Sequence, residues 1–182
     1  MNNIMDTIQV KDKQFALFLS ESEILAQVKR VADEINRDYE GRNPLFLCVL
    51  NGSFMFAADL LKDVNVPCNI SFVKLASYEG TVTSGKVREV MGITQPLEDR
   101  DVIIVEDIVD TGYTMEHMLE SLGTRNPASI AVCTLLCKPG KLKVNLDLKY
   151  VAMNIPDDFI VGYGLDYDGY GRNHRAIYKI VE

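Results

Sequence analysis

The segment from Val102 to Met115 carries the side chains best suited to chemistry. It reads VIIVEDIVDTGYTM, so an apolar, β-branched run leads directly into two carboxylates, Glu106 and Asp107. Such a run predicts a central parallel strand, and open α/β sheets bind ligands at the carboxyl ends of their strands. A carboxylate pair at that end predicts a site for a polyol or a metal ion.

The residues that follow predict a site for an anion. Asp110-Thr111-Gly112-Tyr113-Thr114 stands immediately before a helical pattern. In such a loop, backbone N–H groups and two hydroxyls point at a phosphate, the helix dipole adds to the attraction, and Gly112 allows close backbone approach. The alternative is a capped helix with two solvated acids. Two adjacent acids followed by Asp-Thr-Gly-x-Thr at a strand-to-helix turn form a much rarer combination, which favours the functional interpretation.

Strand and helix patterns alternate around this segment. Ser20 and Glu23 form a capping box before an apolar stripe, which predicts a helix that ends near Gly41. Further helices are expected over 54–61 and 115–122, and strands over 45–50, 69–75, 87–93, 102–105, 129–137, 150–153, 159–162 and 177–181. The order predicts an α/β fold with a mostly parallel, twisted sheet flanked by helices.

Length and composition restrict the class of protein. The chain has 182 residues, of which 47% are hydrophobic and 25% charged, so we expect one globular domain over residues 1–182. The net charge of −7 disfavours a nucleic-acid partner, and the longest apolar run, 45–50, is too short to span a membrane. The four cysteines lack metal-ligand spacing, and no secretory signal pattern is visible, which together indicate a cytoplasmic protein.

Residues 106–114 resemble the phosphoribosyl-pyrophosphate (PRPP) signature of the type I phosphoribosyltransferases. Four further segments resemble the hypoxanthine-guanine branch of that family and extend the resemblance over most of the chain. They are a pyrophosphate loop at 50–53, a mobile polar loop that opens at Ser77-Tyr78, a purine-reading strand end at 135–138, and a base-binding hood at 158–167 with Arg172 beyond it.

The resemblance implies a type I phosphoribosyltransferase-like fold with a small hood subdomain. The hood would consist mainly of residues from about 150 to 182, together with the N-terminal segment. A member of this branch is expected to form a homodimer or a homotetramer. Its reaction belongs to purine salvage: the 5-phosphoribosyl group of PRPP passes to hypoxanthine, or to guanine, which yields IMP or GMP and releases pyrophosphate with the help of Mg²⁺.

The same resemblance implies which residues contact the substrates and the metal. Asp110 would act as general base at N7 of the purine, and Asp166 would coordinate Mg²⁺ on pyrophosphate. Glu106 and Asp107 would engage the ribose hydroxyls directly or through a metal ion. The full set of expected substrate-binding residues is Asn51, Gly52, Ser77, Tyr78, Glu106, Asp107, Asp110, Thr111, Gly112, Tyr113, Thr114, Lys138, Phe159, Ile160 and Arg172.

Within this set, the resemblance separates contacts with the purine from contacts with the phosphates. Lys138 would address the 6-oxo group, Phe159 would stack on the ring, and Ile160 would meet its edge. The loop 111–114 would hold the 5′-phosphate, and Arg172 would neutralise the leaving pyrophosphate. The chemistry fits, because magnesium and an Arg fork stabilise dense negative charge and a carboxylate can accept the purine proton.

Two positions depart from the pattern of the family. Asn51 stands where relatives often carry Lys or Arg, so the pyrophosphate loop lacks that charge, although its backbone N–H groups remain. Tyr113 is bulky for a phosphate loop, but its backbone contribution does not depend on its side chain. The resemblance also predicts that the Leu50–Asn51 peptide bond is cis in at least some states, because this turns the N–H groups of the loop toward pyrophosphate.

Two other classes of protein fit the sequence less well. A catalytically silent regulator that binds RNA would need a basic surface, whereas the net charge is −7. The presence of Asp110, Lys138 and Asp166 also favours an enzyme. An NAD- or ATP-binding domain would need a G-x-G-x-x-G or G-x-x-x-x-G-K-[ST] loop, and the sequence contains neither.

Overall fold

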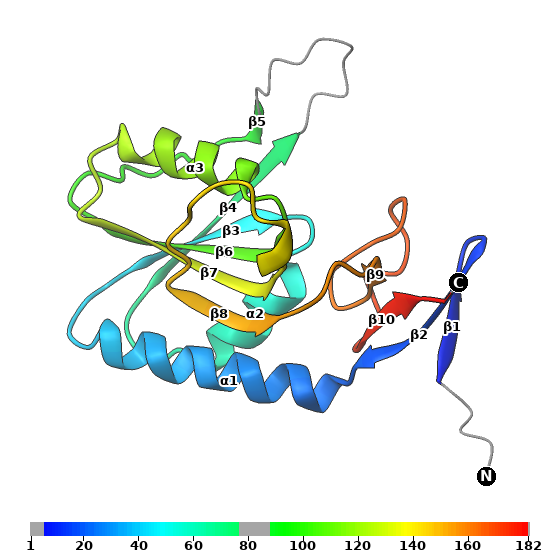
Figure 1. The fold of residues 1–182 in the computed structure, drawn as a ribbon. Helices are drawn as coiled ribbons and strands as arrows, with labels where there is room; N and C mark the ends of the chain where they lie inside the picture. The colour runs from blue at the N-terminus through cyan, green and yellow to red at the C-terminus, as the bar shows by residue number, and fades with distance from the viewer. Residues whose placement is uncertain (1–5, 77–87, 182) are drawn as a thin grey trace.

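The computed structural model describes residues 6–76 and 88–181, which form two β-sheets and three α-helices (Figure 1). The larger sheet has the order β5-β4-β3-β6-β7-β8. Its strands are β3 (Leu45–Leu50), β4 (Asn69–Ala76), β5 (Arg88–Met91), β6 (Asp101–Val109), β7 (Ser129–Cys137) and β8 (Tyr150–Asn154). All neighbours pair in parallel except β5, which runs antiparallel to β4. The predicted α/β fold with a mostly parallel sheet is therefore confirmed.

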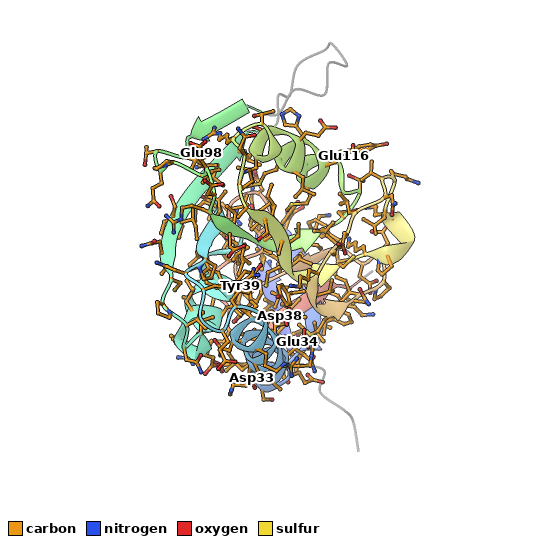
Figure 2. All side chains as sticks on the ribbon, turned by 90° about the vertical axis from the view of Figure 1, so that its left-hand side faces the viewer. Asp33, Glu34, Asp38, Tyr39, Glu98 and Glu116 are labelled. Carbon is orange, nitrogen blue, oxygen red and sulfur yellow. The ribbon has the colours of Figure 1, made fainter. Side chains whose placement is uncertain are left out.

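Helices cover both faces of this sheet. Helices α1 (Glu21–Asp38) and α2 (Phe54–Asp63) pack against each other on one face, and α3 (Tyr113–Gly123) covers the other. Figure 2 shows Glu116 of α3 above the sheet and Asp33 of α1 below it. The predicted capping box begins α1, with the backbone N–H groups of Ser20 and Glu23 each bonded to the side chain of the other.

The strands of the sheet centre alternate between two apolar clusters. Ile103 and Val105 face α1 and α2, whereas Val102 and Ile104 face α3. All four side chains are fully buried. Burial of each is worth about 1.5–3 kcal/mol, so the continuous apolar pattern of β6 fixes it as a central strand. Central position in turn brings the polar residues that follow to the middle of one edge of the sheet.

The smaller sheet joins the two ends of the chain in the order β1-β2-β10-β9. Its strands are β1 (Thr7–Val10), β2 (Lys13–Leu19), β9 (Ile160–Val161) and β10 (Ile177–Ile180). Strands β1 and β2 were not predicted, because the turn between them carries neither Gly nor Asn-Gly, the usual hairpin signal. Lys11 adopts the left-handed conformation there, with a φ of 53°.

The helices that the structure describes include none with the length and apolar character needed to cross a membrane.

Candidate active site

Two carboxylates lie in the last part of β6. The strand runs four residues further than the predicted 102–105, so Glu106 and Asp107 belong to it rather than following it. The backbone N–H of Asp107 donates to Glu106 Oε1 over 3.2 Å, and that of Ile108 donates to Asp107 Oδ1 over 2.8 Å. Burial raises the pKa of Glu106 well above its usual value, and the charge of Asp107 adds to the effect. A metal ion or hydroxyl donors would therefore stabilise the charged form of this pair.

The loop after β6 surrounds a small cavity at the N-terminus of α3. The cavity has a volume of about 100 Å³. It is lined by Glu106, Ile108, Val109, Asp110, Thr111, Gly112, Thr114 and Met115. The first backbone N–H groups of a helix have no partner within the helix, so they are available to an anion. The bulky Tyr113 side chain is 57% exposed and is absent from the cavity lining, in agreement with the expected backbone role.

Gly112 is required by both its conformation and its surroundings. It is the N-cap of α3 with a φ of 90°, a region that L side chains rarely adopt. A Cβ atom there would lie 2.7 Å from Val144 and 2.8 Å from Leu146. The segment that follows β7 thus packs directly against the loop 110–114, the predicted phosphate site.

The predicted pyrophosphate loop lies against the acidic pair. The Leu50–Asn51 peptide bond is cis, as expected. Gly52 is buried, and a Cβ atom at this position would overlap the carboxylate of Asp107. Asn51 is exposed, and the Ser53 hydroxyl donates to the Val49 carbonyl over 2.6 Å. Only glycine lets this loop approach the carboxyl end of β6 so closely.

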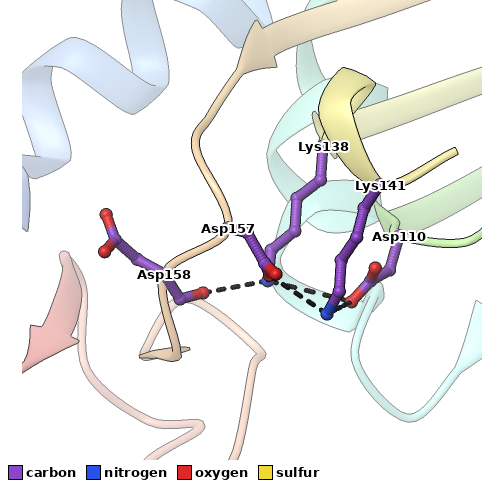
Figure 3. A network of polar contacts seen from close by, with 5 residues as sticks. All are labelled: Asp110, Lys138, Lys141, Asp157 and Asp158. Atoms are coloured by element: carbon purple, nitrogen blue, oxygen red, sulfur yellow. Dashed lines mark hydrogen bonds and ion pairs between the residues drawn. The ribbon is translucent and has the colours of Figure 1, made fainter.

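Lys138 is a buried cation at the end of β7. Its side chain is only 8% exposed. The ammonium donates to Asp157 Oδ1 and to the Asp158 carbonyl, each over 2.9 Å, and lies 3.8 Å from Asp110 Oδ2 (Figure 3). Its own backbone N–H donates to the Val109 carbonyl over 3.0 Å, which ties the end of β7 to the end of β6.

A second lysine joins this network. Lys141 Nζ lies 3.2 Å from Asp110 Oδ2 and 3.0 Å from Asp157 Oδ1 (Figure 3). Hydrogen bonds from Lys138 and then from Lys141 lower the pKa of Asp157. Within the described residues, Asp110 Oδ1 is buried and lacks a hydrogen-bond partner. Asp110 therefore has one oxygen held by a cation and one available to a ligand.

An aromatic residue, Phe159, directly precedes strand β9 of the smaller sheet. Phe159 is 45% exposed, and its ring centroid lies 6.0 Å from Phe15 and 5.7 Å from Tyr167. Ile160, the next residue, is buried and begins β9. Lys138 donates a hydrogen bond to the carbonyl of Asp158, the residue that directly precedes Phe159. The exposed ring is therefore attached next to a residue that contacts the buried ammonium.

Asp166 and Arg172 pair with each other. Arg172 Nη2 lies 2.6 Å from Asp166 Oδ1, and Arg172 Nη1 donates to the Gly164 carbonyl over 2.7 Å. Gly164 packs so tightly on the carbonyl of Gly52 that a Cβ atom would overlap it. The pair is thus connected to the pyrophosphate loop through one glycine contact.

The structure brings most of the predicted site residues to one edge of the larger sheet. Residues 106–107 and 110–114 surround or adjoin the cavity, Gly52 contacts Asp107, and Lys138 lies beside Asp110. Ser77 and Tyr78 lie outside the described residues. Lys141 and Asp157 were missed, although both have a signal in the sequence: Lys141 follows Lys138 by three residues, and Asp157 directly precedes the matched hood segment.

Comparison with known sequences identifies the family. The phosphoribosyl transferase domain matches residues 18–168. A hypoxanthine phosphoribosyltransferase of Haemophilus influenzae is 37% identical over 176 residues, which cover 94% of this chain and 98% of the relative. A hypoxanthine-guanine phosphoribosyltransferase of Streptococcus thermophilus is 38% identical over 164 residues, covering 90% of this chain and 91% of the relative.

Solved structures agree with the sequence comparison. The crystal structure of a hypoxanthine-guanine phosphoribosyltransferase from Bacillus anthracis has a TM-score of 0.86 and 38% identity, covering 91% of this chain and 96% of the other. A Lys-to-Arg variant of the Trypanosoma cruzi hypoxanthine phosphoribosyltransferase, complexed with its product IMP, has a TM-score of 0.86 and 37% identity, covering 96% and 93%. With the fold, the carboxylate pair and the phosphate-sized cavity in place, these matches establish that the chain is a member of the phosphoribosyltransferase family.

Proposed function

We propose that the chain transfers the 5-phosphoribosyl group of PRPP to hypoxanthine and to guanine, forming IMP or GMP and pyrophosphate. One observation carries the proposal: the buried ammonium of Lys138 lies beside Asp110, next to the loop cavity, and one Asp110 oxygen has no hydrogen-bond partner in the described part of the chain. A 6-oxopurine offers an acceptor for the first and a proton for the second. The names of the relatives support the same substrates.

One carboxylate, Asp110, acts on the purine, and the other two, Glu106 and Asp107, act on the ribose of PRPP. Asp110 Oδ1 accepts the proton that the purine loses as its nitrogen attacks the ribose. Glu106 and Asp107 bind the ribose hydroxyls in this proposal, and their negative charge favours the cationic sugar of the transition state. Backbone N–H groups of the loop 111–114 hold the 5′-phosphate, and Phe159 stacks on the purine.

A magnesium ion fits the residues around the pyrophosphate position. No three potential metal-binding side chains converge within the described part of the chain. Magnesium usually takes only one or two carboxylates, with waters and substrate phosphates as its other ligands, so Asp166 and the Glu106–Asp107 pair form a suitable set. When bound, the ion neutralises the leaving pyrophosphate. Arg172 adds a second positive charge to that position.

Residues 1–182 act as one domain in this proposal, with the smaller sheet as the hood over the purine. The chain works as a homodimer or homotetramer in the cytoplasm. Two observations support these assignments. Ile70 and Phe72 expose 45% and 44% of their surface on the same face of β4, and all four cysteines are free, as suits a reducing compartment.

A substrate panel tests the reaction. The protein is mixed with PRPP, Mg²⁺ and one of hypoxanthine, guanine, xanthine or adenine, and nucleotide formation is followed by chromatography. Hypoxanthine and guanine are expected to react, and adenine is expected to react far more slowly. The Asp110→Asn variant, purified in the same way, controls for enzymes of the expression host. Absence of IMP and GMP from the unmodified protein would refute the proposal.

A further inference from the structure

Two cations and two anions form a closed group at the purine end of the site. Asp110 Oδ2 lies 3.2 Å from Lys141 and 3.8 Å from Lys138, while Asp157 Oδ1 lies 3.0 Å from Lys141 and 2.9 Å from Lys138. Lys141, not Lys138, is therefore the cation within hydrogen-bond distance of Asp110. Figure 3 shows both ammonium groups beside the same carboxylates.

The two lysines would have different hydrogen-bond partners when a purine is bound. Under the proposed function, the Lys138 ammonium donates to the purine 6-oxo oxygen, so it gains a partner outside the protein. Of the two Asp110 oxygens, Lys141 binds only Oδ2. This leaves Oδ1, which has no hydrogen-bond partner among residues 6–76 and 88–181, for the purine proton. An ammonium has three donors, so Lys141 holds Asp110 and Asp157 at once.

The backbone keeps Lys141 in this place. It ends the short 3₁₀ turn Pro139–Lys141, and its N–H donates to the Lys138 carbonyl over 2.9 Å. On either side, Lys138 N–H bonds the Val109 carbonyl over 3.0 Å, and Lys143 N–H bonds the Thr111 carbonyl over 2.9 Å. The turn is thus attached to both neighbours of Asp110 in the chain.

We infer that Lys141 is a positioning residue for the reaction: it fixes the Asp110 carboxylate so that Oδ1 faces the purine. The inference rests on the proposed function and assigns Lys141 a role that it exerts through its contact with Asp110. As the purine nitrogen bonds to C1′ and the C1′–pyrophosphate bond breaks, the purine proton moves to Asp110 Oδ1. Asp110 becomes neutral at that moment, and Lys141 keeps Asp157 as its ionised partner.

Single variants test the position and the charge. Lys141→Met is expected to lower kcat for IMP synthesis by about 10- to 100-fold, while KM for PRPP changes less than threefold, because misplacement of a catalytic group chiefly affects the chemical step. Lys141→Arg is expected to recover most of the loss, since its guanidinium also reaches two carboxylates. Lys143→Met is the matched control: it removes an exposed charge two residues away and should leave kcat within twofold.

A double-mutant cycle shows whether Lys141 acts through Asp110. In the Asp110→Asn background, Lys141→Met is expected to change the single-turnover rate less than twofold, because no general base remains to be positioned. An equal loss in both backgrounds, with activity present in the unmodified protein, would overturn the inference and leave the proposed function standing. An unmodified protein that converts no 6-oxopurine would overturn the proposed function and this role with it.

Discussion

Under the proposed function, Lys138 is the residue on which the choice of purine depends. Its ammonium is buried and carries hydrogen-bond donors but no acceptor. It is therefore expected to favour a purine with an oxygen at position 6 over one with an amino group there. Sites of this kind discriminate by about 10⁴–10⁵-fold. We predict that kcat/KM for adenine is lower than for hypoxanthine by a factor of this order, and that Lys138→Ala narrows the gap by losing hypoxanthine activity. Comparable use of the two bases by the unmodified protein would rule out this role of Lys138.

Asp110 gives a second prediction at the same scale. Asp110→Asn keeps the size of the side chain but removes the proton acceptor. General base catalysis is typically worth about 10²–10⁴-fold, so single-turnover synthesis of IMP should slow by that range while the dissociation constant of PRPP changes little. Rapid-quench kinetics and calorimetric titration measure the two quantities. A rate equal to that of the unmodified protein would show that the proton leaves by another route.

The residues of the site differ in how far the sequence reveals them. Glu106 and Asp107 follow a buried apolar run, so their position near the carboxyl end of a strand could be predicted from pattern alone, although the strand itself continues to Val109. Lys141 could not, because its role depends on a turn that returns its side chain to Asp110. No local sequence pattern predicts this contact between two loops that are far apart in the chain.

The bounds of the strands likewise differ in how far the sequence predicts them. The predicted bounds of β3 and β7 match the structure, since β3 is apolar throughout, β7 is apolar except for Ser129 and Thr134, and turn residues follow both strands. The prediction for β6 stopped short, because pairing with β7 continues through the polar residues: Glu106 pairs with Thr134 and Val109 with Cys137. Tertiary pairing thus extends the strand beyond its apolar run.

The connection between α1 and β8 gives a prediction on stability. The Tyr150 hydroxyl donates to Asp38 Oδ2 over 2.6 Å, and Lys149 lies 2.9 Å from the same oxygen. The Tyr150 hydrogen bond, followed by that of Lys149, lowers the pKa of Asp38 below its ordinary 3.8. A lowered pKa stabilises the fold above pH 3.8, and this contribution is lost as the pH falls through the value in the folded state.

We therefore predict that Tyr150→Phe lowers the free energy of unfolding by about 1 kcal/mol at pH 7. The difference from the unmodified protein should shrink as the pH falls through the lowered pKa of Asp38, because Asp38 is then protonated in both the folded and the unfolded state. Urea denaturation at several pH values measures it. Tyr113→Phe, which changes an exposed tyrosine, is the control and should have no effect. A constant difference at every pH would exclude the Asp38 hydrogen bond as its cause.

At the scale of the whole molecule, the uncovered face of β4 bears on assembly. Ile70 and Phe72 lie in register with Phe46 and Cys48, so they share the sheet face that α1 and α2 cover elsewhere. Self-association of the chain through this face would bury the exposed apolar surface of both side chains. We predict that Phe72→Asp shifts the protein toward monomer in analytical ultracentrifugation, whereas Leu25→Asp, at a similarly exposed position on α1, does not. A monomeric unmodified protein at assay concentration would contradict this assignment.

The pairing of β2 with β10 sets an order in which the site is completed during synthesis on the ribosome. Phe15 of β2 pairs with Ile180 of β10. Strand β2 is synthesised before every strand of the larger sheet, but it cannot pair with β10 until β10 has been synthesised, after all of them. The larger sheet, with its carboxylates and phosphate loop, has all of its strands before β10 leaves the ribosome. The aromatic platform built on Phe15 and Phe159 does not, because it needs both ends of the smaller sheet. A nascent chain therefore acquires the Glu106–Asp107 pair and the loop 111–114, which are expected to bind the ribose and its 5′-phosphate, before the Phe15–Phe159 contact that supports the ring expected to stack on the purine.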